Sequence, residues 1–405
     1  MRVLITTLHF HPLVPIAQAL AAAGHEVAFA CSEDNRPAVE ATGFRLFPAG
    51  TSMRALLPDL LPRLMALPAE QRDAWVLRQT FGGALPERII PDLLAICRAW
   101  APDLIVRDTL ELGGCVVAEH LGLPHASVEV GIFMSAPWLA QLVGDHLQRL
   151  RAGLGLLPDP DLAMLYRYLH LSFVPPGYQD PAMPLPPTAH TLRTVVFDRS
   201  GDEGLPVWVE HLPDQPTVYA TLGTAFNRDA DTVAAILAGL RDEPLTLIVT
   251  VGRDQDPAQF GPQPPNVHVE RYIPQSLLLP RCDLVVCHGG WNTVLAALSA
   301  GLPLVLLPLG ADQPRHAARC ADLGVGRVVA PDRRTPGAIR EAARDVLQAP
   351  RYRQRARRLR AEMEALPGPE WAVALLERLA VGRRPLIAAA PPRARGADGG
   401  VRSAD

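Results

Sequence analysis

The sequence predicts an α/β protein built from two doubly wound parallel sheets. Its 405 residues are too many for one ordinary domain and fit two domains of about 200 residues each. Apolar strand-like runs alternate with helical segments from Val3 to Val128, and the alternation starts again at Val218, as in parallel sheets. A proline-rich stretch without periodicity, residues 172–215, separates the two parts. We therefore expect one domain at 1–200, a second at 201–382 and a disordered tail at 383–405.

Composition restricts the class of protein. Hydrophobic residues make up 48% and charged residues 20%, as in globular proteins, and a formal net charge of -3 gives no reason to expect nucleic acid. The six cysteines form no C-x-x-C pair, so a disulfide framework is not expected. Prolines interrupt the long apolar runs, and the opening Met1–Ile5 is too short for a signal peptide core. The protein is therefore expected to be cytoplasmic and to have no membrane-spanning helix.

The first domain is expected to begin with a buried strand, a loop and a helix. Pro12 lies in the first turn of that helix and Gly24 closes it, as proline favours helix starts and glycine favours helix ends. Residues 52–100 form a long insertion of apolar helices broken by prolines. The expected strands are Val3–Thr6, Val27–Ala30, Phe44–Phe47, Leu104–Val106 and His125–Val128, with a helix at Asn35–Ala41.

Two polar residues follow the first and fourth of these strands. In the usual doubly wound order these strands are neighbours, so the loops that hold His9 and Asp108 face the same crevice. A neutral imidazole can accept a proton from a hydroxyl, while a nearby carboxylate fixes its tautomer and stabilises the imidazolium. The pair then forms a base and its partner, with Glu111 as a second candidate for the partner. On residue chemistry alone, a loop cap at His9 and a helix N-cap at Asp108 are equally consistent.

The second domain repeats the alternation, and its first and fourth strands should again be neighbours. This places Gly223 and Thr224, after the first strand, opposite His288, after the fourth. No G-x-G-x-x-G pattern follows either first strand and no G-K-[ST] loop is present, which argues against a nicotinamide cofactor and against a kinase or ATPase. The expected strands are Val218–Thr221, Leu245–Val251, Val267–Val269, Leu284–Cys287, Leu304–Leu307 and Val328–Val329, with helices at Asp229–Leu240, Thr293–Ala300, Arg351–Glu364 and Trp371–Leu379.

A His-Gly-Gly turn joins the strand at Leu284 to the helix that starts at Thr293. Its glycines let the backbone turn sharply, so the amides that open the helix point at an anion, which the helix dipole also favours. This is a candidate diphosphate cradle, although a plain strand-to-helix turn has the same pattern. Asp312 and Gln313, at the end of the next strand, favour the ligand site, because open α/β sheets bind ligands at the carboxyl ends of their strands.

The stretch from Tyr272 to Gln313 resembles the nucleotide-sugar signature of family 1 glycosyltransferases, which runs W-x-P-Q, H-C/G-G-W-N-S/T, G-x-P and D-Q. It is matched in order by Pro274-Gln275, His288-Gly289-Gly290-Trp291-Asn292-Thr293, Gly301-Leu302-Pro303 and Asp312-Gln313. Three other segments are similar to further motifs of this family. They are Thr221-Leu222-Gly223-Thr224 (S/T-x-G-S/T), Leu8-His9-Phe10-His11-Pro12 (G-H-x-x-P, with Leu for Gly) and Pro102 to Asp108 (P-D-x-x-x-x-D).

The resemblance implies a GT-B fold, in which two domains face each other across a cleft and the last helix crosses back onto the first domain. It makes His9 the catalytic base, Asp108 its partner and the reaction an inverting, metal-independent transfer from a nucleotide-sugar co-substrate, without a cofactor. A metal pair of His9 with His11 lacks a third ligand, and the three D-x-D triplets are better explained as caps. The implied donor-binding residues are Gly223, Thr224, Tyr272, Ile273, Gln275, His288, Gly289, Gly290, Trp291, Asn292, Thr293, Asp312 and Gln313.

Two departures from the family pattern bear on the donor. Tyr272 replaces the usual tryptophan but keeps an aromatic face for the base. Ala296 replaces the glutamate that holds the ribose hydroxyls in plant-type members, so the site offers no partner for a 2′-hydroxyl. This favours a deoxyribose donor, such as a dTDP-sugar, over a UDP-sugar.

The acceptor is expected to be a hydrophobic small molecule. The apolar helices of residues 52–100 and the stretch 132–139 suggest a pocket for a flat or macrocyclic aglycone, although core packing would account for most of these residues. The overall pattern is most similar to bacterial glycosyltransferases of antibiotic and other secondary-metabolite pathways, up to about Val381. We expect a monomer or homodimer with a nucleotide-sugar and such an acceptor as its partners. The candidates for acceptor contact are Phe10, Glu111, Phe133 and Trp138.

Two other functions remain open. A nucleotide-sugar 2-epimerase shares this fold but would need no acceptor domain with a base after its first strand. A non-catalytic relative would bind and activate a partner transferase, yet such a homologue need not keep His9, Asp108, His288 and the Asp312-Gln313 pair.

Overall fold

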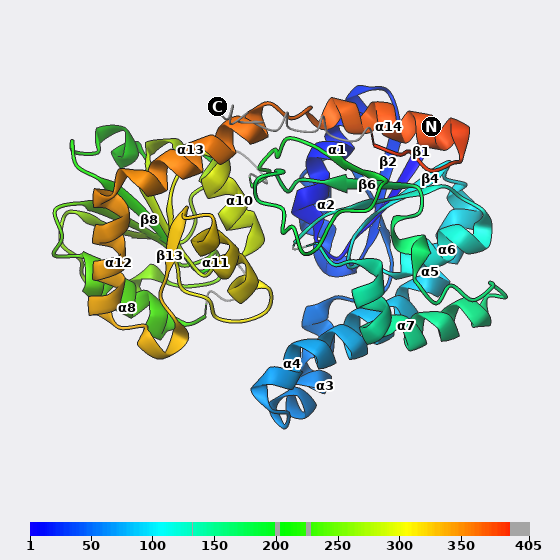
Figure 1. The fold of residues 1–405 in the computed structure, drawn as a ribbon, viewed down its shortest axis with the longest axis horizontal. Coiled ribbons are helices and arrows are strands. Elements are labelled where there is room, and N and C mark those ends of the chain that lie inside the picture. The colour runs from blue at the N-terminus through cyan, green and yellow to red at the C-terminus, as the bar shows by residue number, and fades with distance from the viewer. Residues whose placement is uncertain (132, 199–202, 224–227, 389–405) are drawn as a thin grey trace, which may run out of the picture.

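The computed structural model describes residues 1–131, 133–198, 203–223 and 228–388, which form two α/β domains (Figure 1). Each domain contains one parallel sheet with helices packed around it, which confirms the predicted fold class. Within the described ranges, no helix has the length and apolar character needed to cross a bilayer. All six cysteines lie in these ranges as buried free thiols.

The N-terminal sheet has seven parallel strands in the order β3-β2-β1-β4-β5-β6-β7. The five strands predicted from the apolar runs are all present. Their neighbours β6 and β7 extend the sheet by two strands that the sequence did not indicate. The bounds are β1 Arg2–Thr6, β2 Glu26–Cys31, β3 Arg45–Pro48, β4 Leu104–Asp108, β5 His125–Val128, β6 Leu169–Ser172 and β7 Ala189–Thr191.

β7 lies in the proline-rich stretch 172–215 and pairs with β6 as the edge strand of the N-terminal sheet. It falls before residue 200, where the first domain was expected to end. The prolines that surround this three-residue strand are tolerated there because an edge strand leaves one row of amides without a ladder partner. The loop 173–188 therefore belongs to the first domain.

The helices of the first domain cover its sheet and form the predicted insertion. A helical stretch with a π-helical segment at Leu77–Ala84 runs through residues 53–100, and α3 and α4 project away from the sheet (Figure 1). The bounds are α1 Phe10–Ala22, α2 Arg36–Glu40, α3 Met53–Met65, α4 Ala69–Val76, α5 Leu85–Trp100, α6 Gly113–Leu121 and α7 Ala136–Gly153.

The C-terminal sheet has six parallel strands in the order β10-β9-β8-β11-β12-β13. All six were predicted, within a residue or two at each end. The bounds are β8 Thr217–Thr221, β9 Thr246–Thr250, β10 Val267–Glu270, β11 Leu284–Cys287, β12 Leu304–Leu306 and β13 Gly326–Val328. The helices are α8 Ala230–Leu240, α9 Gln275–Leu278, α10 Trp291–Ser299, α11 Gln313–Asp322, α12 Pro336–Gln348 and α13 Pro350–Glu364.

The last helix, α14 (Pro369–Gly382), returns to the first domain and packs against α1, as the resemblance implied (Figure 1). Nε2 of His25 lies 3.0 Å from Oε1 of Glu377 on this helix. The chain continues in contact with the domain, since Leu386 is buried and its amide donates to the carbonyl of Tyr168 at 2.8 Å. The remainder of the predicted tail, 389–405, lies outside the described residues.

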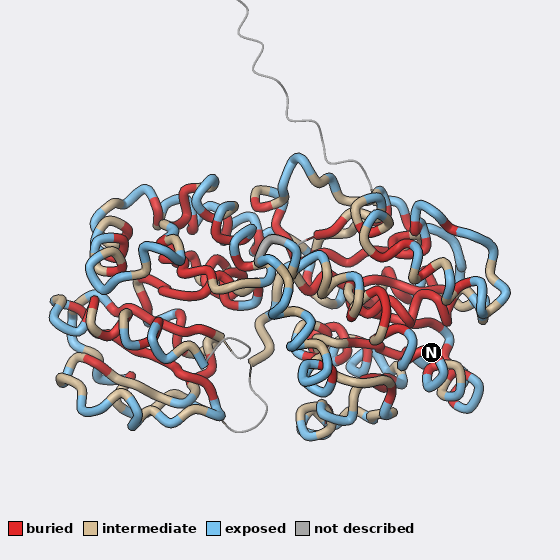
Figure 2. Tube along the Cα trace, turned by 90° about the horizontal axis from the view of Figure 1, so that it is seen from below, coloured by how far each residue is buried: buried red, intermediate tan, exposed pale blue. Residues whose placement is uncertain are grey.

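The strand order determines which loops lie next to each other at the carboxyl ends of the strands. β1 pairs with β4 and β8 pairs with β11, so in each domain the loops after the first and fourth strands lie side by side, as predicted. The strands form the buried centre of each domain, with exposed chain around them (Figure 2). One cluster of buried apolar side chains includes residues of both domains, among them Tyr178 and Trp291, whose ring centroids are 5.4 Å apart.

Candidate active site

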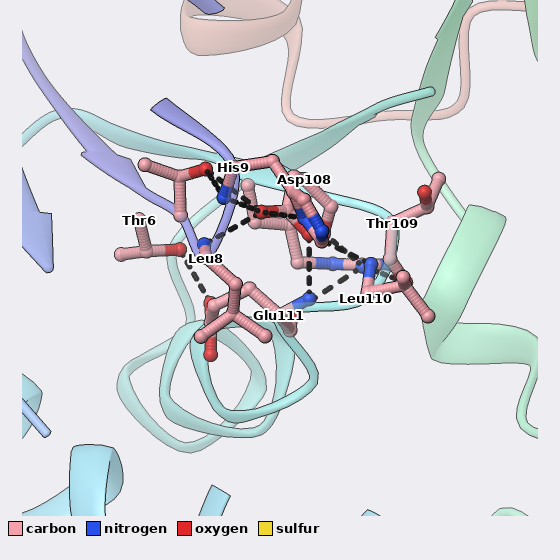
Figure 3. Close-up of polar contacts among 9 residues, drawn as sticks. Thr6, Leu8, His9, Asp108, Thr109, Leu110 and Glu111 are labelled. Atoms are coloured by element: carbon pink, nitrogen blue, oxygen red, sulfur yellow. Dashed lines mark hydrogen bonds and ion pairs between the residues drawn. The ribbon is translucent and has the colours of Figure 1, made fainter. Parts of the chain in front are cut away.

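His9 and Asp108 meet at the carboxyl ends of β1 and β4 (Figure 3). Nδ1 of His9 lies 3.4 Å from Oδ2 of Asp108. The same oxygen accepts hydrogen bonds from Thr7 Oγ1 and Leu8 N, each at 2.7 Å, and from His9 N at 3.1 Å. The structure thus brings together the two residues predicted to form the dyad, and the Asp108 carboxylate also fixes the backbone of the loop that carries His9.

The electrostatics of this pair suit a base that takes up a proton. Burial alone would lower the pKa of His9, but the hydrogen bond and charge of Asp108, together with the charge of Asp312, raise it above its ordinary value of 6.5. Burial alone would raise the pKa of Asp108, but the His9 contact and the hydrogen bonds from Thr7 and Leu8 lower it to about 2. Asp108 therefore stays ionised, while the His9 side chain, 41% exposed, remains open to substrate.

The loop after β4 is held by a residue that sequence reasoning missed. Arg107 is fully buried, and its Nη1 donates to the carbonyl of Asp108 at 3.0 Å, while Nη2 donates to the carbonyl of Leu165. The amides of Leu110 and Glu111 donate to Asp108 Oδ1 at 2.8 Å. Arg107 lies in a buried strand, where no pattern marked it as more than a core residue.

Glu111 does not act as the partner of His9 in this structure. Its carboxylate accepts from Thr6 Oγ1 at 2.5 Å and from the amides of Gly113 and Gly114 at 2.8 and 2.9 Å, which caps the start of α6. Burial and the nearby charge of Asp108 raise its pKa. It also lines a cavity beside the His9 loop, together with Leu8, Leu85, Pro86, Ile89 and Leu110.

The aromatic candidates for acceptor contact differ in position. Phe10 is buried in the core, with its ring centroid 5.0 Å from that of Phe29, and Phe133 is buried against Tyr166 at 5.3 Å. Packing accounts for both. Trp138, at the start of α7, is only half-buried. The guanidinium of Arg315 in the second domain lies 5.1 Å from the centroid of its ring, so Trp138 alone of these aromatic candidates faces the other domain.

In the second domain, the ring of His288 lies between two glycines. A Cβ at Gly223 would come within 2.7 Å of His288 Cε1, and a Cβ at Gly290 would overlap His288 Nε2. Gly223 also has a φ of +72, which side chains rarely adopt. Burial lowers the pKa of His288 to about 4, despite the charge of Asp312 and a hydrogen bond to the Thr221 backbone. The imidazole is therefore neutral near pH 7.

The turn after His288 has the predicted geometry. Gly289 has a φ of +86, and α10 begins at Trp291, directly after Gly290. Asn292 is exposed on the first turn, while Thr293 is buried. Trp291 is buried as well, and its ring stacks on His316 with centroids 4.9 Å apart, so it packs inside the protein. Thr224, the predicted hydroxyl donor opposite this turn, lies outside the described residues.

The side chains of Asp312 and Gln313 make different contacts. Oε1 of Gln313 accepts from the amides of Leu309 and Gly310 at 2.8 and 3.1 Å, so it holds the preceding loop. The Asp312 side chain is 37% exposed. It lies near the first domain, where a Cβ at Gly131 would come within 3.4 Å of its Oδ2 and its charge acts on His9. The predicted sugar-binding carboxylate of the second domain thus lies close enough to the predicted base of the first for its charge to act on it.

Tyr272, predicted to offer an aromatic face to the base, has one side of its ring covered. The guanidinium of Arg253 lies 3.7 Å from the centroid of the Tyr272 ring and covers one side of it. The Tyr272 hydroxyl donates to the carbonyl of Asp198. Ile273 is buried in the core, and Gln275 Nε2 lies 3.4 Å from the hydroxyl of Tyr219. Arg253 was not predicted, because an arginine after a strand carries no signal of its own.

The D-x-D triplets act as caps, as predicted. Asp229 accepts from the amide of Thr232 at the start of α8, Asp256 accepts from Ala258, and Asp159 accepts from Ala163. No group of three or more metal-ligating side chains occurs in the part of the chain that the structure describes.

Comparisons with known proteins agree with this fold. Two family models match the chain: "Erythromycin biosynthesis protein CIII-like, N-terminal domain" at residues 18–223 and the corresponding C-terminal domain at residues 235–379. The chain is 29% identical to 3-alpha-mycarosylerythronolide B desosaminyl transferase of Saccharopolyspora erythraea, over 95% of this chain and 99% of that protein.

Two solved structures are similar over nearly the whole chain. The glycosyltransferase SnogD from Streptomyces nogalater has a TM-score of 0.79 and 28% identity, covering 94% of this chain and 99% of its own. The glycosyltransferase VinC, solved in complex with DTDP, has a TM-score of 0.77 and 26% identity, covering 94% and 100%.

Proposed function

The chain belongs to the erythromycin biosynthesis protein CIII-like family of glycosyltransferases, and from this membership we propose its reaction: inverting, metal-independent transfer from a nucleoside-diphosphate sugar to a hydroxyl of a hydrophobic natural-product aglycone. The protein is a GT-B glycosyltransferase of secondary metabolism. The observation that carries the proposal is the His9–Asp108 pair within reach of the charge of Asp312, since it combines a base with a carboxylate suited to sugar hydroxyls.

In the proposed reaction, His9 accepts the proton of the acceptor hydroxyl. Because Nδ1 faces Asp108, this assigns the Nδ1–H tautomer and leaves Nε2 to take the proton. The hydroxyl oxygen then attacks the anomeric carbon as the bond to the diphosphate breaks, so one displacement inverts the configuration. The imidazolium formed at His9 is stabilised by ionised Asp108, whose pKa of about 2 keeps it charged.

The leaving diphosphate would bind at the His288 turn. The amides at the start of α10 and the helix dipole favour an anion there. The His288 ring fills the space that a side chain at position 223 or 290 would need, so both positions require glycine. The backbone of both loops can therefore come close to the ligand. Charge that develops on the diphosphate is thus met by protein dipoles without a metal ion.

Two observations support a dTDP-sugar as the donor. Ala296 is buried on α10, so it offers nothing to a ribose 2′-hydroxyl. The related VinC was solved with DTDP. Leu8, at the position where the family pattern has glycine, lines a small cavity with Leu85 and Ile89 beside the His9 loop.

The test is turnover, followed by mass spectrometry, of a dTDP-deoxysugar and of UDP-glucose with phenolic and macrolide acceptors. Wild type is compared with His9→Ala and with His211→Ala, which removes an exposed histidine far along the chain. We expect product from wild type and His211→Ala only, with nucleotide binding kept in all three proteins. Product from His9→Ala at the wild-type rate would remove His9 from the mechanism.

The same assay separates the rival functions. Release of free epimerised sugar without an acceptor would indicate a 2-epimerase. Tight nucleotide binding without turnover on any acceptor would indicate a non-catalytic activator. Faster use of UDP-glucose than of every dTDP-sugar would overturn the donor assignment, and a rate that collapsed in EDTA and returned with manganese would overturn metal independence.

A further inference from the structure

The loop 173–188 of the first domain inserts an aromatic side chain into the second domain. Tyr178 is buried, with its ring against Trp291 of α10 at 5.4 Å and against His316 of α11 at 6.3 Å. Arg319, also on α11, holds this segment: its Nε donates to the carbonyl of Tyr178 at 2.7 Å and its Nη2 to the carbonyl of Gln179 at 2.8 Å. Tyr178 is therefore a fixed part of the second domain's interior.

Three side chains form a hydrogen-bonded chain from this point to Asp312. The Tyr178 hydroxyl lies 3.1 Å from Nδ1 of His316, and Nε2 of His316 lies 3.2 Å from Oδ2 of Asp312. His316 is fully buried and stacks on Trp291 at 4.9 Å, with 20° between the rings, so its orientation is fixed. The outer end of the chain, Asp312, is the carboxylate whose charge acts on His9.

The hydrogen bonds determine the tautomer of His316. A carboxylate only accepts, so Nε2 carries the proton that faces Asp312, and Nδ1 then accepts from the Tyr178 hydroxyl. In this arrangement, each of the two hydrogen bonds that link Tyr178, His316 and Asp312 has one donor and one acceptor. Loss of Tyr178 or His316 would leave a buried polar group without its partner, which costs about 1–3 kcal/mol per group.

We propose that His316 and Tyr178 are positioning residues that hold the Asp312 carboxylate in the orientation that binds the donor sugar. The inference rests on the proposed function, in which Asp312 contacts sugar hydroxyls. Oδ2 of Asp312 is bound to His316 and lies toward Gly131 of the first domain, while the Asp312 side chain stays 37% exposed. Because Tyr178 comes from the first domain, the orientation of the sugar-binding residue depends on the contact between the domains.

This role predicts an effect on the sugar that leaves the nucleotide unaffected. The diphosphate would be bound by the amides of the His288 turn, whereas the hydrogen bonds of His316 and Tyr178 lead to Asp312. Trp291 at the start of α10 packs on both rings, so the variants that keep a side chain in place, His316→Gln and Tyr178→Phe, disturb the turn least. A misplaced sugar lowers the rate of transfer steeply, since an error of about 1 Å can cost about 100-fold. We therefore expect kcat/KM for the nucleotide-sugar to fall about 100-fold in His316→Ala, a much larger loss than that in affinity for free nucleoside diphosphate.

The experiment compares His316→Ala, His316→Gln and Tyr178→Phe with two matched controls. His268→Ala removes a histidine that stacks on a tryptophan elsewhere, with ring centroids 3.8 Å apart, and Tyr352→Phe removes a buried tyrosine's bond to Asp345 at 3.0 Å. Both controls should keep wild-type kcat/KM. His316→Gln, whose amide can still donate to Asp312 and accept from Tyr178, should recover part of the lost rate, and thermal unfolding checks that each variant is folded.

A double-mutant cycle with Asp312→Asn separates positioning from general damage. If His316 acts only through Asp312, then His316→Ala adds no further loss of kcat/KM in the Asp312→Asn background. Additive losses, or a folded His316→Ala with wild-type kcat/KM, would overturn the inference while leaving the proposed function intact. Full activity of Asp312→Asn would instead contradict the sugar-binding role of Asp312 in the proposed function.

Discussion

His9 and His288 border the switch points of the two sheets, His9 after the first strand of one and His288 after the fourth strand of the other, yet their surroundings give them opposite properties. His9 follows β1 beside β4, and Asp108 raises its pKa above the ordinary value. His288 borders the same switch point of the second sheet, after β11 beside β8, but burial between two glycines lowers its pKa to about 4. The same side chain is thus prepared to take up a proton in one domain and to stay neutral in the other.

The comparison teaches that the role of each histidine is set by its neighbours. A carboxylate with a pKa of about 2 makes His9 a base, because it stabilises the imidazolium. Glycines without side chains make His288 a buried neutral imidazole beside a helix N-terminus, because they let the backbone approach the ring. Substitution of the carboxylate beside His9 should therefore lower kcat, and substitution of a glycine beside His288 should lower the affinity for the donor.

The largest effect is expected from Asp108→Asn. The amide cannot stabilise the imidazolium, and its NH2 group would face at least one of the donors that now bond Asp108. We expect kcat to fall by roughly 10⁴-fold, the scale seen when a catalytic histidine loses its carboxylate partner, with little change in the Kd of nucleoside diphosphate. Steady-state rates and calorimetric nucleotide titration measure the two quantities. A drop in nucleotide affinity as large as the drop in kcat would contradict this division between the domains.

A smaller effect, in the other parameter, is expected from Gly290→Ala. The added methyl overlaps Nε2 of His288 and must displace the ring or the turn, at a cost of about 1–3 kcal/mol. The affinity for nucleoside diphosphate should fall about 10- to 100-fold. Gly337→Ala is the matched control, since a Cβ there meets nothing within 4 Å on α12. Equal nucleotide affinity in both variants would mean that the space around His288 does not matter for the donor.

Much of the frame that holds these histidines could be predicted from the sequence. Apolar runs bounded by glycine, proline and polar residues carry a local signal, so the central strands of both sheets and the pairing of first with fourth strands were predicted correctly. β6 and β7 were missed because β6 contains the buried polar residues His170 and Ser172, and β7 is a three-residue edge strand among prolines. Their pairing depends on long-range contacts that no local pattern records.

The candidate site likewise contains residues that the sequence predicted and residues that it did not. His9, Asp108 and the His-Gly-Gly turn stand in recognisable motifs, and the structure brings the first two together. The support of the site carries no such signal: Tyr178 and His316 are 138 residues apart, and Arg107 bonds to the carbonyl of Leu165 across 58 residues. Conversely, Phe10 and Trp291 stand in motif positions but pack inside the protein, because a motif fixes sequence position and not the direction of a side chain.

Acid stability gives a third test of the dyad. The pKa of Asp108 is about 2 in the folded protein and 3.8 ordinarily, so the folded state favours the ionised carboxylate. This contribution, about 2 kcal/mol, is present above pH 4 and is lost as the pH falls through 2. Urea unfolding of wild type and Asp108→Asn at several pH values isolates it. The difference in their unfolding free energies should shrink between pH 4 and pH 2, and a constant difference would contradict the lowered pKa.

The smallest effect concerns Asp312, whose charge reaches both histidines. For a base that must be neutral, kcat/KM rises as the pH passes the pKa of His9, and since that pKa is raised, the midpoint should lie above 6.5. His288, with a pKa of about 4, stays neutral over this range and adds no second step. Asp312→Asn removes one of the charges that raise the pKa of His9, so the midpoint measured on the residual activity should move to lower pH. The movement should be smaller than in Asp108→Asn, because Asp108 contributes both a hydrogen bond and the stronger charge effect. An unchanged midpoint would mean that the two domains do not share one electrostatic site.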